Sequence, residues 1–317
     1  MKGALWLAWR QQRLLILTAV ALLVGCAVWV AYQRSGMTQL IEEYGWVPCP
    51  GWNGGCESVA TYEIMNGNVD GIRMLGTLGF AIPALIGVFW GAPLIGRELE
   101  SGTFKMALTQ GVDPRGWFAA RFGLAALVAL LTSAVVAALV AWWWLPIANT
   151  LEGPYWHDAV VYNATGPAPL AAALFALAVG TLAGLLVGKV LPAMGAAFGV
   201  IGTAMLAVNF FRTSWIDPEI RITPGMTPKR LVGSAWSTGE FGYRTPDGRE
   251  FSIDQWCQTS GWDAQQCMDE NGFTSRYHKV YPSGDFWTFQ WIDTALYLGL
   301  AAVLVAVTLA VLRRRTA

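Results

Sequence analysis

Six uninterrupted apolar stretches constrain this chain more than any other feature of its sequence. A helix needs about 20 mostly apolar residues to cross a hydrocarbon core of about 30 Å. Stretches that satisfy this condition lie at residues 14–32, 74–95, 122–145, 170–188, 190–211 and 291–312. They contain no Asp, Glu, Lys or Arg except Asp293, which lies at the outer boundary of the last one, where water is near. The pattern predicts an all-α polytopic membrane protein with six transmembrane helices.

The composition agrees with this class. Only 13% of the 317 residues are charged and 55% are hydrophobic, whereas a soluble domain carries about a quarter charged residues. The fourth and fifth stretches are separated by little more than Lys189, Leu191 and Pro192. A single helix of about 40 residues is the alternative there, but a lysine at mid-membrane and a proline argue against it. We therefore expect a tight hairpin.

The distribution of charge predicts the orientation. Eleven basic and three acidic residues lie before the first stretch, at 96–121, at Lys189 and in the tail 313–317. The other connections, taken together with the boundary residue Asp293, hold ten basic and eighteen acidic residues. Because basic loops stay in the cytoplasm, we expect both termini to be cytoplasmic. Residues 1–13 have one apolar side and a basic side formed by Lys2, Arg10 and Arg13, which predicts an interfacial amphipathic helix.

The N-terminus has a second interpretation. Leu23-Val24-Gly25-Cys26 resembles a lipoprotein processing site behind a basic region and an apolar run, which would remove the first 25 residues. A processed lipoprotein usually continues with a polar tether, whereas residues 27–32 stay apolar. We therefore treat Cys26 as an ordinary residue within the first span.

The predicted external segments are residues 33–73, 146–169 and 212–290, and they hold the four cysteines outside the spans. Four cysteines allow three connectivities, of which we favour the local disulfides Cys49–Cys56 and Cys257–Cys267 in an oxidising compartment. Neither His157 nor His278 lies at zinc-ligand spacing from them, so we expect no metal site. Residues 212–290 show no long apolar periodicity and predict a small disulfide-braced cap.

Residues 96–121 form the connection with the most informative pattern. Leu99, Thr103 and Met106 recur at helical spacing, which favours a short amphipathic helix at the membrane surface, interrupted at Gly102. Glu98 and Glu100 are acidic on an otherwise basic side, and such carboxylates suit an arginine on a partner. A solvated loop with charges near the membrane is the alternative.

Several motifs resemble those of one family. The connection matches Arg-Glu-x-Glu-x-Gly-Thr, then Thr-Gln, then Trp, at Arg97, Glu98, Glu100, Gly102, Thr103, Thr109, Gln110 and Trp117. The opening Trp9-Arg10-Gln11-Gln12-Arg13 and the closing stretch 281–292 are also similar to the ABC-2-type transporter permeases of actinobacteria. This resemblance covers both ends and the central connection.

The resemblance implies a permease subunit that works with a second permease copy and two cytoplasmic ATPase subunits. Residues 96–121 would be the coupling loop, with Arg97, Glu98, Glu100, Gly102 and Thr103 in the contact. ATP and Mg²⁺ would be bound by the ATPase, since this chain has no Gly-x-x-x-x-Gly-Lys-Ser/Thr sequence, and residues 184–190 have the wrong spacing for one. We therefore expect neither enzymatic activity nor a cofactor in this chain.

The small residues Gly180, Gly184 and Gly188 recur every four positions. Such a face lets helices pack closely, either within the subunit, which we favour, or between two subunits. Pro83 predicts a kink in the second span.

The function predicted from these features is the export of a hydrophobic or amphipathic compound (an antibiotic, peptide or lipid, with drug resistance as one outcome) across a bacterial plasma membrane. No feature indicates a nucleic-acid partner. The alternative is a non-transporting sensor or scaffold whose external segment binds a ligand. The two hypotheses differ in whether an ATPase docks at residues 97–115.

Overall fold

The computed structural model describes residues 2–47, 59–102, 114–148, 150, 153–224, 235–252, 266 and 269–316. Six helices in these ranges are long and apolar enough to cross a membrane. Five of them are α1 (Lys2–Tyr44), α6 (Pro114–Trp144), α8 (Ala168–Val187), α9 (Val190–Phe211) and α11 (Asp285–Thr316). The remaining one, second along the chain, is a composite of α2 (Val59–Met65), α3 (Asn68–Leu85), the π-helical turn η1 (Ile86–Gly91) and α4 (Ala92–Glu100). Short elements between them are η2 (Leu145–Ile147), α7 (Ala159–Tyr162) and η3 (Arg212–Ser214).

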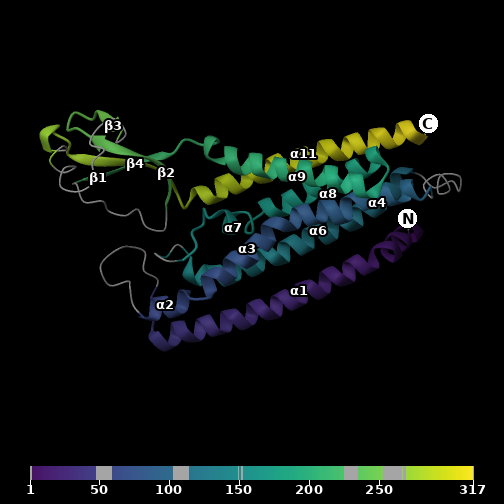
Figure 1. Ribbon diagram of the computed structural model, residues 1–317, viewed down its shortest axis with the longest axis horizontal. Helices are drawn as coiled ribbons and strands as arrows, with labels where there is room; N and C mark the ends of the chain where they lie inside the picture. Colours follow the sequence, from purple (N-terminus) through teal and green to yellow (C-terminus); the bar gives the residue numbers. More distant parts are fainter. Residues whose placement is uncertain are drawn as a thin grey trace.

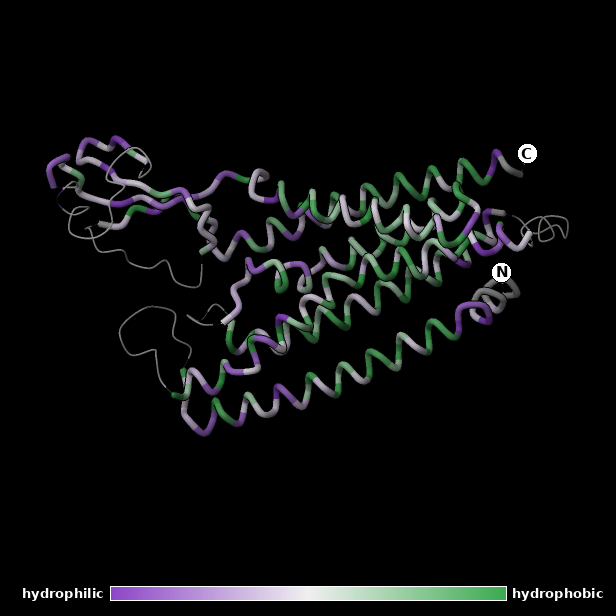
Figure 2. The backbone as a smooth tube through the Cα atoms, viewed as in Figure 1, coloured by the Kyte–Doolittle hydropathy of each residue, from purple (hydrophilic) through white to green (hydrophobic). Residues whose placement is uncertain are grey.

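The long helices run side by side, and the molecule has two distinct ends (Figure 1). Both termini and the end of α4 lie at one end, called here the terminal end. The strands, α2 and α7 lie at the other, called here the sheet end. Figure 2 shows that the middle of the helices is mostly hydrophobic and that hydrophilic residues concentrate in the sheet and near the helix ends. This distribution is the one that a bilayer around the helices requires.

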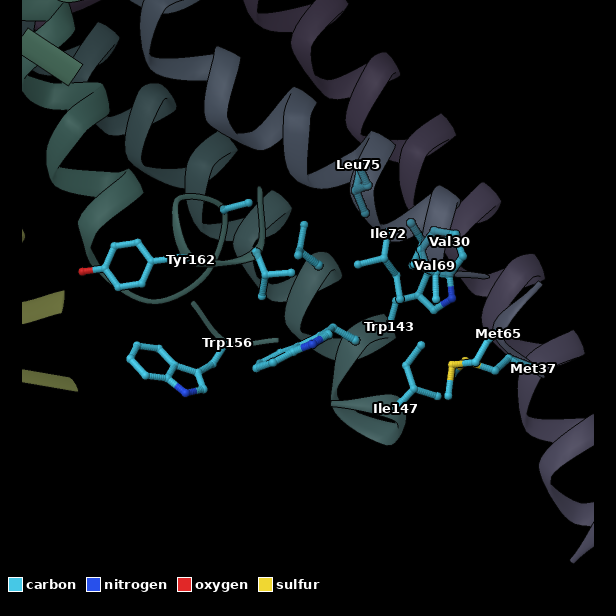
Figure 3. Close-up of a cluster of buried hydrophobic side chains, with 14 of the residues drawn as sticks. Val30, Met37, Met65, Val69, Ile72, Leu75, Trp143, Ile147, Trp156 and Tyr162 are labelled. Carbon is cyan, nitrogen blue, oxygen red and sulfur yellow. The ribbon is translucent and has the colours of Figure 1, made fainter. Parts of the chain in front are cut away.

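Helix α1 is continuous from Lys2 to Tyr44, so the residues expected to begin an external connection at position 33 are helical. No proline interrupts this helix, and Val30 and Met37 are buried against α2, α3 and α6 (Figure 3). Those contacts extend the helix beyond the hydrophobic stretch predicted from hydropathy. Along its most apolar 18 residues α1 is sparsely covered, since only 11% of them are buried. A membrane-surface position for residues 1–13 remains a prediction.

Helix α8 is the centre of the bundle, and it packs against α3, α4, α6, α9 and α11. Of its most apolar 18 residues, 67% are buried, because the alanines and glycines that line much of its surface let the neighbouring helices approach closely. A Cβ added to Gly180 would collide with the carbonyl oxygen of Gly87, and one added to Gly184 with that of Ala92. Gly188 is different: it follows the helix in the left-handed conformation (φ 69) and has no neighbour around an added Cβ. It ends α8 rather than extending the packing face.

The expectation of an all-α fold is wrong for the segment before the last helix. The described residues of this segment hold a four-stranded antiparallel sheet of order β1-β4-β2-β3. Its strands are β1 (Glu219–Pro224), β2 (Ala235–Arg244), β3 (Glu250–Ser252) and β4 (Ser275–Pro282). The strands are short and amphipathic, and β2 has an irregular register between Ser237 and Phe241. Such strands give little hydropathy signal beside six long apolar helices.

Candidate functional site

The end of α4 is held by an ion pair within the chain. Glu98 accepts a hydrogen bond from Arg121 of α6 at 2.6 Å, and the two side chains are 18% and 7% exposed. Arg121 also lies over the ring of Trp117, 4.4 Å from its centroid, and donates to Gln11 of α1. The sequence favours an arginine of a partner opposite Glu98, whereas in the structure Glu98 pairs with Arg121 of the same chain.

Gln12 continues this polar network inside the bundle. The residue is only 5% exposed. Its amide donates to the backbone oxygen of Arg121 at 3.3 Å and accepts the indole N–H of Trp90 at 2.9 Å. Trp90 belongs to the π-helical turn η1, so Gln12 connects α1 with α6 and with the composite second helix. The network satisfies polar groups that would otherwise be costly to bury.

Glu100 acts on a different helix. Its carboxylate accepts the backbone N–H of Val190, the first residue of α9, at 3.0 Å. A carboxylate at a helix N-terminus is stabilised by the unpaired N–H groups and by the helix dipole. Glu100 therefore caps α9 from the end of α4.

The other predicted coupling residues lie at the surface or outside the described residues. Arg97 is exposed, and Gly102 follows α4 in a left-handed conformation with φ +72. Ser101, which was not among the predicted residues, is exposed between them. Thr103 lies outside the described residues. Within them, Arg97 has no ion pair. Two of the predicted residues, Glu98 and the exposed Glu100, thus bond within the chain through their carboxylates. The exposed residues Arg97, Ser101 and Gly102 form a short rim beside them.

A cavity of about 380 Å³ lies between α1, α4 and α6 at the terminal end. Its walls include Gln11, Gln12, Leu15, Trp90, Arg97 and Arg121. Sequence reasoning missed it, although Gln11 and Gln12 are part of the N-terminal motif. Spacing along one helix cannot show that they meet residues about 80 to 110 positions away.

The sheet end has a buried ion pair that the sequence did not predict. Arg212 donates to Asp293 at 3.1 Å, with side-chain exposures of 4% and 1%. The guanidinium lies 3.9 Å from the ring centroid of Tyr162, whose hydroxyl donates to Asp293 at 3.1 Å. Arg212 also donates to Asn163 at 2.8 Å and Asn209 at 3.0 Å. Our placement of Asp293 near water is therefore wrong, because α7 and the end of α9 cover it.

Aromatic side chains join the sheet to the helices just beyond this pair. His157 is stacked between Tyr155 and Trp236 of β2, with ring centroids 5.4 and 5.7 Å away. Trp156 packs edge-on against Trp236 and Phe286. Burial lowers the pKa of His157 because it removes water from the charged imidazolium. This cluster fixes the position of β2 relative to α11.

Two further expectations concern cysteines and metals. Cys49, Cys56, Cys257 and Cys267 all lie outside the described residues, so the two disulfides stay predictions. Cys26 lies in α1 as a free thiol. Among the described residues, no group of three or more His, Cys, Asp or Glu side chains is placed to hold a metal ion.

Comparison with known protein families gave a match. A family model described as ABC-2 membrane transporter related matches residues 20–212, well over half of the chain. The matched range begins within α1 and ends at Arg212, so it includes α4 and the residues around it. No curated protein and no solved structure matched the chain.

Proposed function

Because the chain belongs to the ABC-2 membrane transporter related family, we propose that it is the permease subunit of an ATP-driven exporter. A separate ATPase would bind at the terminal end and hydrolyse ATP with Mg²⁺. Two ATPase copies and a second permease subunit would complete the assembly. The terminal end then lies in the cytoplasm and the sheet outside, in accordance with the basic residues around the termini.

The observation that supports this proposal best is how the end of α4 is connected. Glu98 bonds to Arg121 of α6 and accepts from Gln11 of α1, while Glu100 bonds to the first residue of α9. Helix α4 continues without a gap into η1 and α3. A displacement of this end would therefore be passed to four of the six long helices.

We infer different roles for the residues at this end of α4. Arg97 and Gly102 of the predicted set are exposed, as is the neighbouring Ser101, and these residues would touch the ATPase together with Thr103. Glu98 and Glu100 would act indirectly, by holding α4 to its neighbours. Removal of these carboxylates would loosen the link to the spans while leaving the exposed rim in place.

The spans favour a cargo of low polarity. Three of their hydroxyls already donate within their own helix: Thr18 to Leu15, Thr77 to Arg73 and Thr181 to Leu177. Few hydrogen-bonding groups are left to replace the hydration of an ion or a sugar. A hydrophobic or amphipathic compound, such as an antibiotic, peptide or lipid, fits such a path across a bacterial plasma membrane.

Affinity purification from native membranes in a mild detergent tests the proposal. We expect an ATPase with a nucleotide-binding sequence to co-purify with the wild-type protein. Ser101→Trp places a bulky side chain on the exposed rim and should reduce its recovery. Ser214→Trp is the control and should not, since Ser214 is an exposed serine at the sheet end. Absence of an ATPase from the wild-type preparation would leave the sensor or scaffold hypothesis instead.

A further inference from the structure

The cavity between α1, α4 and α6 is polar at one side and apolar at the other. Leu15 lies one helical turn from Gln11, and Trp90 lies about two turns from Arg97, in the direction away from the terminal end. Pro93 and Leu94 extend the apolar part of the wall. The polarity of the cavity therefore changes along the helix axes, as the polarity of a lipid leaflet does.

The charges in the cavity favour an anion. Glu98 is compensated by Arg121 at 2.6 Å, which leaves the positive charge of Arg97. Arg97 lines the cavity, is exposed, and has no ion pair within the described residues. The polar groups of Gln12 and Trp90 bond to each other or to the backbone. Among the described residues that line the cavity, Arg97 is thus the cation without an ion pair, and a guanidinium suits a phosphate well.

The rim of the cavity is open to apolar chains on the side of α1. Leu15 is 44% exposed, and Leu22 on the same helix is 75% exposed. Helix α1 packs mainly against α6 and α2, so most of its surface near the cavity is available to lipid. A soluble anion would gain nothing from Leu15, Pro93 and Leu94, whereas acyl chains would.

We propose that this cavity binds a phospholipid with an anionic headgroup, taken from the leaflet at the terminal end. The phosphate lies against Arg97, and the chains pass Leu15 and continue along α1. A bound lipid would fill the space between α1 and α4 and so support the network around Glu98. The inference requires only that the chain lies in a membrane; it does not depend on an ATPase or on transport.

Lipid retention by the purified protein tests this site without ATPase or nucleotide. The protein is reconstituted in phosphatidylcholine vesicles that contain one-fifth phosphatidylglycerol, extracted in a mild detergent, and its bound lipids are counted by mass spectrometry. We expect phosphatidylglycerol to be enriched on the wild type, and its retention to fall about tenfold in Arg97→Gln, which removes one charged contact. Arg314→Gln, an exposed arginine of the same end, is the control and should retain it.

Two further arms separate the possible sources of the phosphate. Leu15→Trp fills the apolar part of the cavity without changing its charge, and it should displace the lipid while Arg97 remains. Glycerol phosphate in excess should compete poorly, because it lacks the chains. Equal retention by wild type and Arg97→Gln would overturn the proposal. Displacement by glycerol phosphate as effective as by phosphatidylglycerol would also overturn it, since the site would then bind a soluble anion.

Discussion

Asp293→Asn should destabilise the sheet end strongly. The substitution keeps the shape of the side chain but removes the negative charge that compensates Arg212, and both side chains are at most 4% exposed. Loss of one partner of a buried ion pair costs about 3–5 kcal/mol, because the other charge stays buried. Asn163 and Asn209 still accept from Arg212, and the ring of Tyr162 still faces it. We therefore expect the lower part of this range, about 3 kcal/mol.

Equilibrium unfolding in mixed detergent micelles measures this loss. The matched set is Asp293→Asn, Arg212→Gln and the double variant. If the two side chains form a buried pair, the double variant should be less destabilised than the sum of the singles by about 1.5 kcal/mol or more. A change below about 0.5 kcal/mol for Asp293→Asn, or additive singles, would refute the reasoning, since either result would mean that water already solvates both groups.

Three other predictions concern packing, pH and redox state. Gly180→Ala places a Cβ against the carbonyl oxygen of Gly87 and should lower the free energy of unfolding by about 2 kcal/mol in the same assay. Gly195→Ala is the control: an added Cβ there has no neighbour within 4 Å, so it should be neutral or slightly stabilising. Equal effects of the two substitutions would contradict the close approach at Gly180. Because the pKa of His157 is lowered in the folded protein, the unfolded chain binds the proton more tightly, so the contribution of His157 to stability should be complete above about pH 6.5 and fall as the pH drops below it. The Tm of the wild type should show this fall, and that of His157→Phe should not. Parallel curves of Tm against pH for the two proteins would be evidence against it. A thiol reagent added without prior reduction should leave the four predicted external cysteines unmodified: Cys49, Cys56, Cys257 and Cys267. Their labelling would exclude the two predicted disulfides.

The number of long helices could be predicted because hydropathy is local. Each span is recognisable from about 20 consecutive residues, and the described residues contain six helices that are long and apolar enough to cross a membrane. The break after α8 was also predictable from nearby residues, Lys189 and Pro192, whereas the role of Gly188 in ending the helix was not predicted. The sheet was missed because its strands are stabilised by pairing between distant segments, such as Ser237 with Val280, which local periodicity does not record.

The polar networks show the same limit. Glu98 and Arg121 are charged residues of one connection, residues 96–121, yet their pairing depends on how α4 meets α6. Arg212 and Asp293 are 81 positions apart, and each looks like an ordinary boundary residue by itself. Complementary charges at the same end of two spans were the available signal. Contacts of this kind become visible only when the helices are placed against one another.

ATP hydrolysis by the reconstituted assembly of permease and ATPase tests most directly whether the end of α4 couples the two subunits. Glu98→Ala combined with Glu100→Ala should leave the ATPase bound, because the exposed rim at Arg97, Ser101 and Gly102 is intact. Hydrolysis stimulated by the permease should fall several-fold, because α4 has lost its bonds to α6 and α9. Unchanged stimulated hydrolysis in the double variant, with the protein folded, would contradict the claim that the end of α4 transmits the drive to the membrane helices.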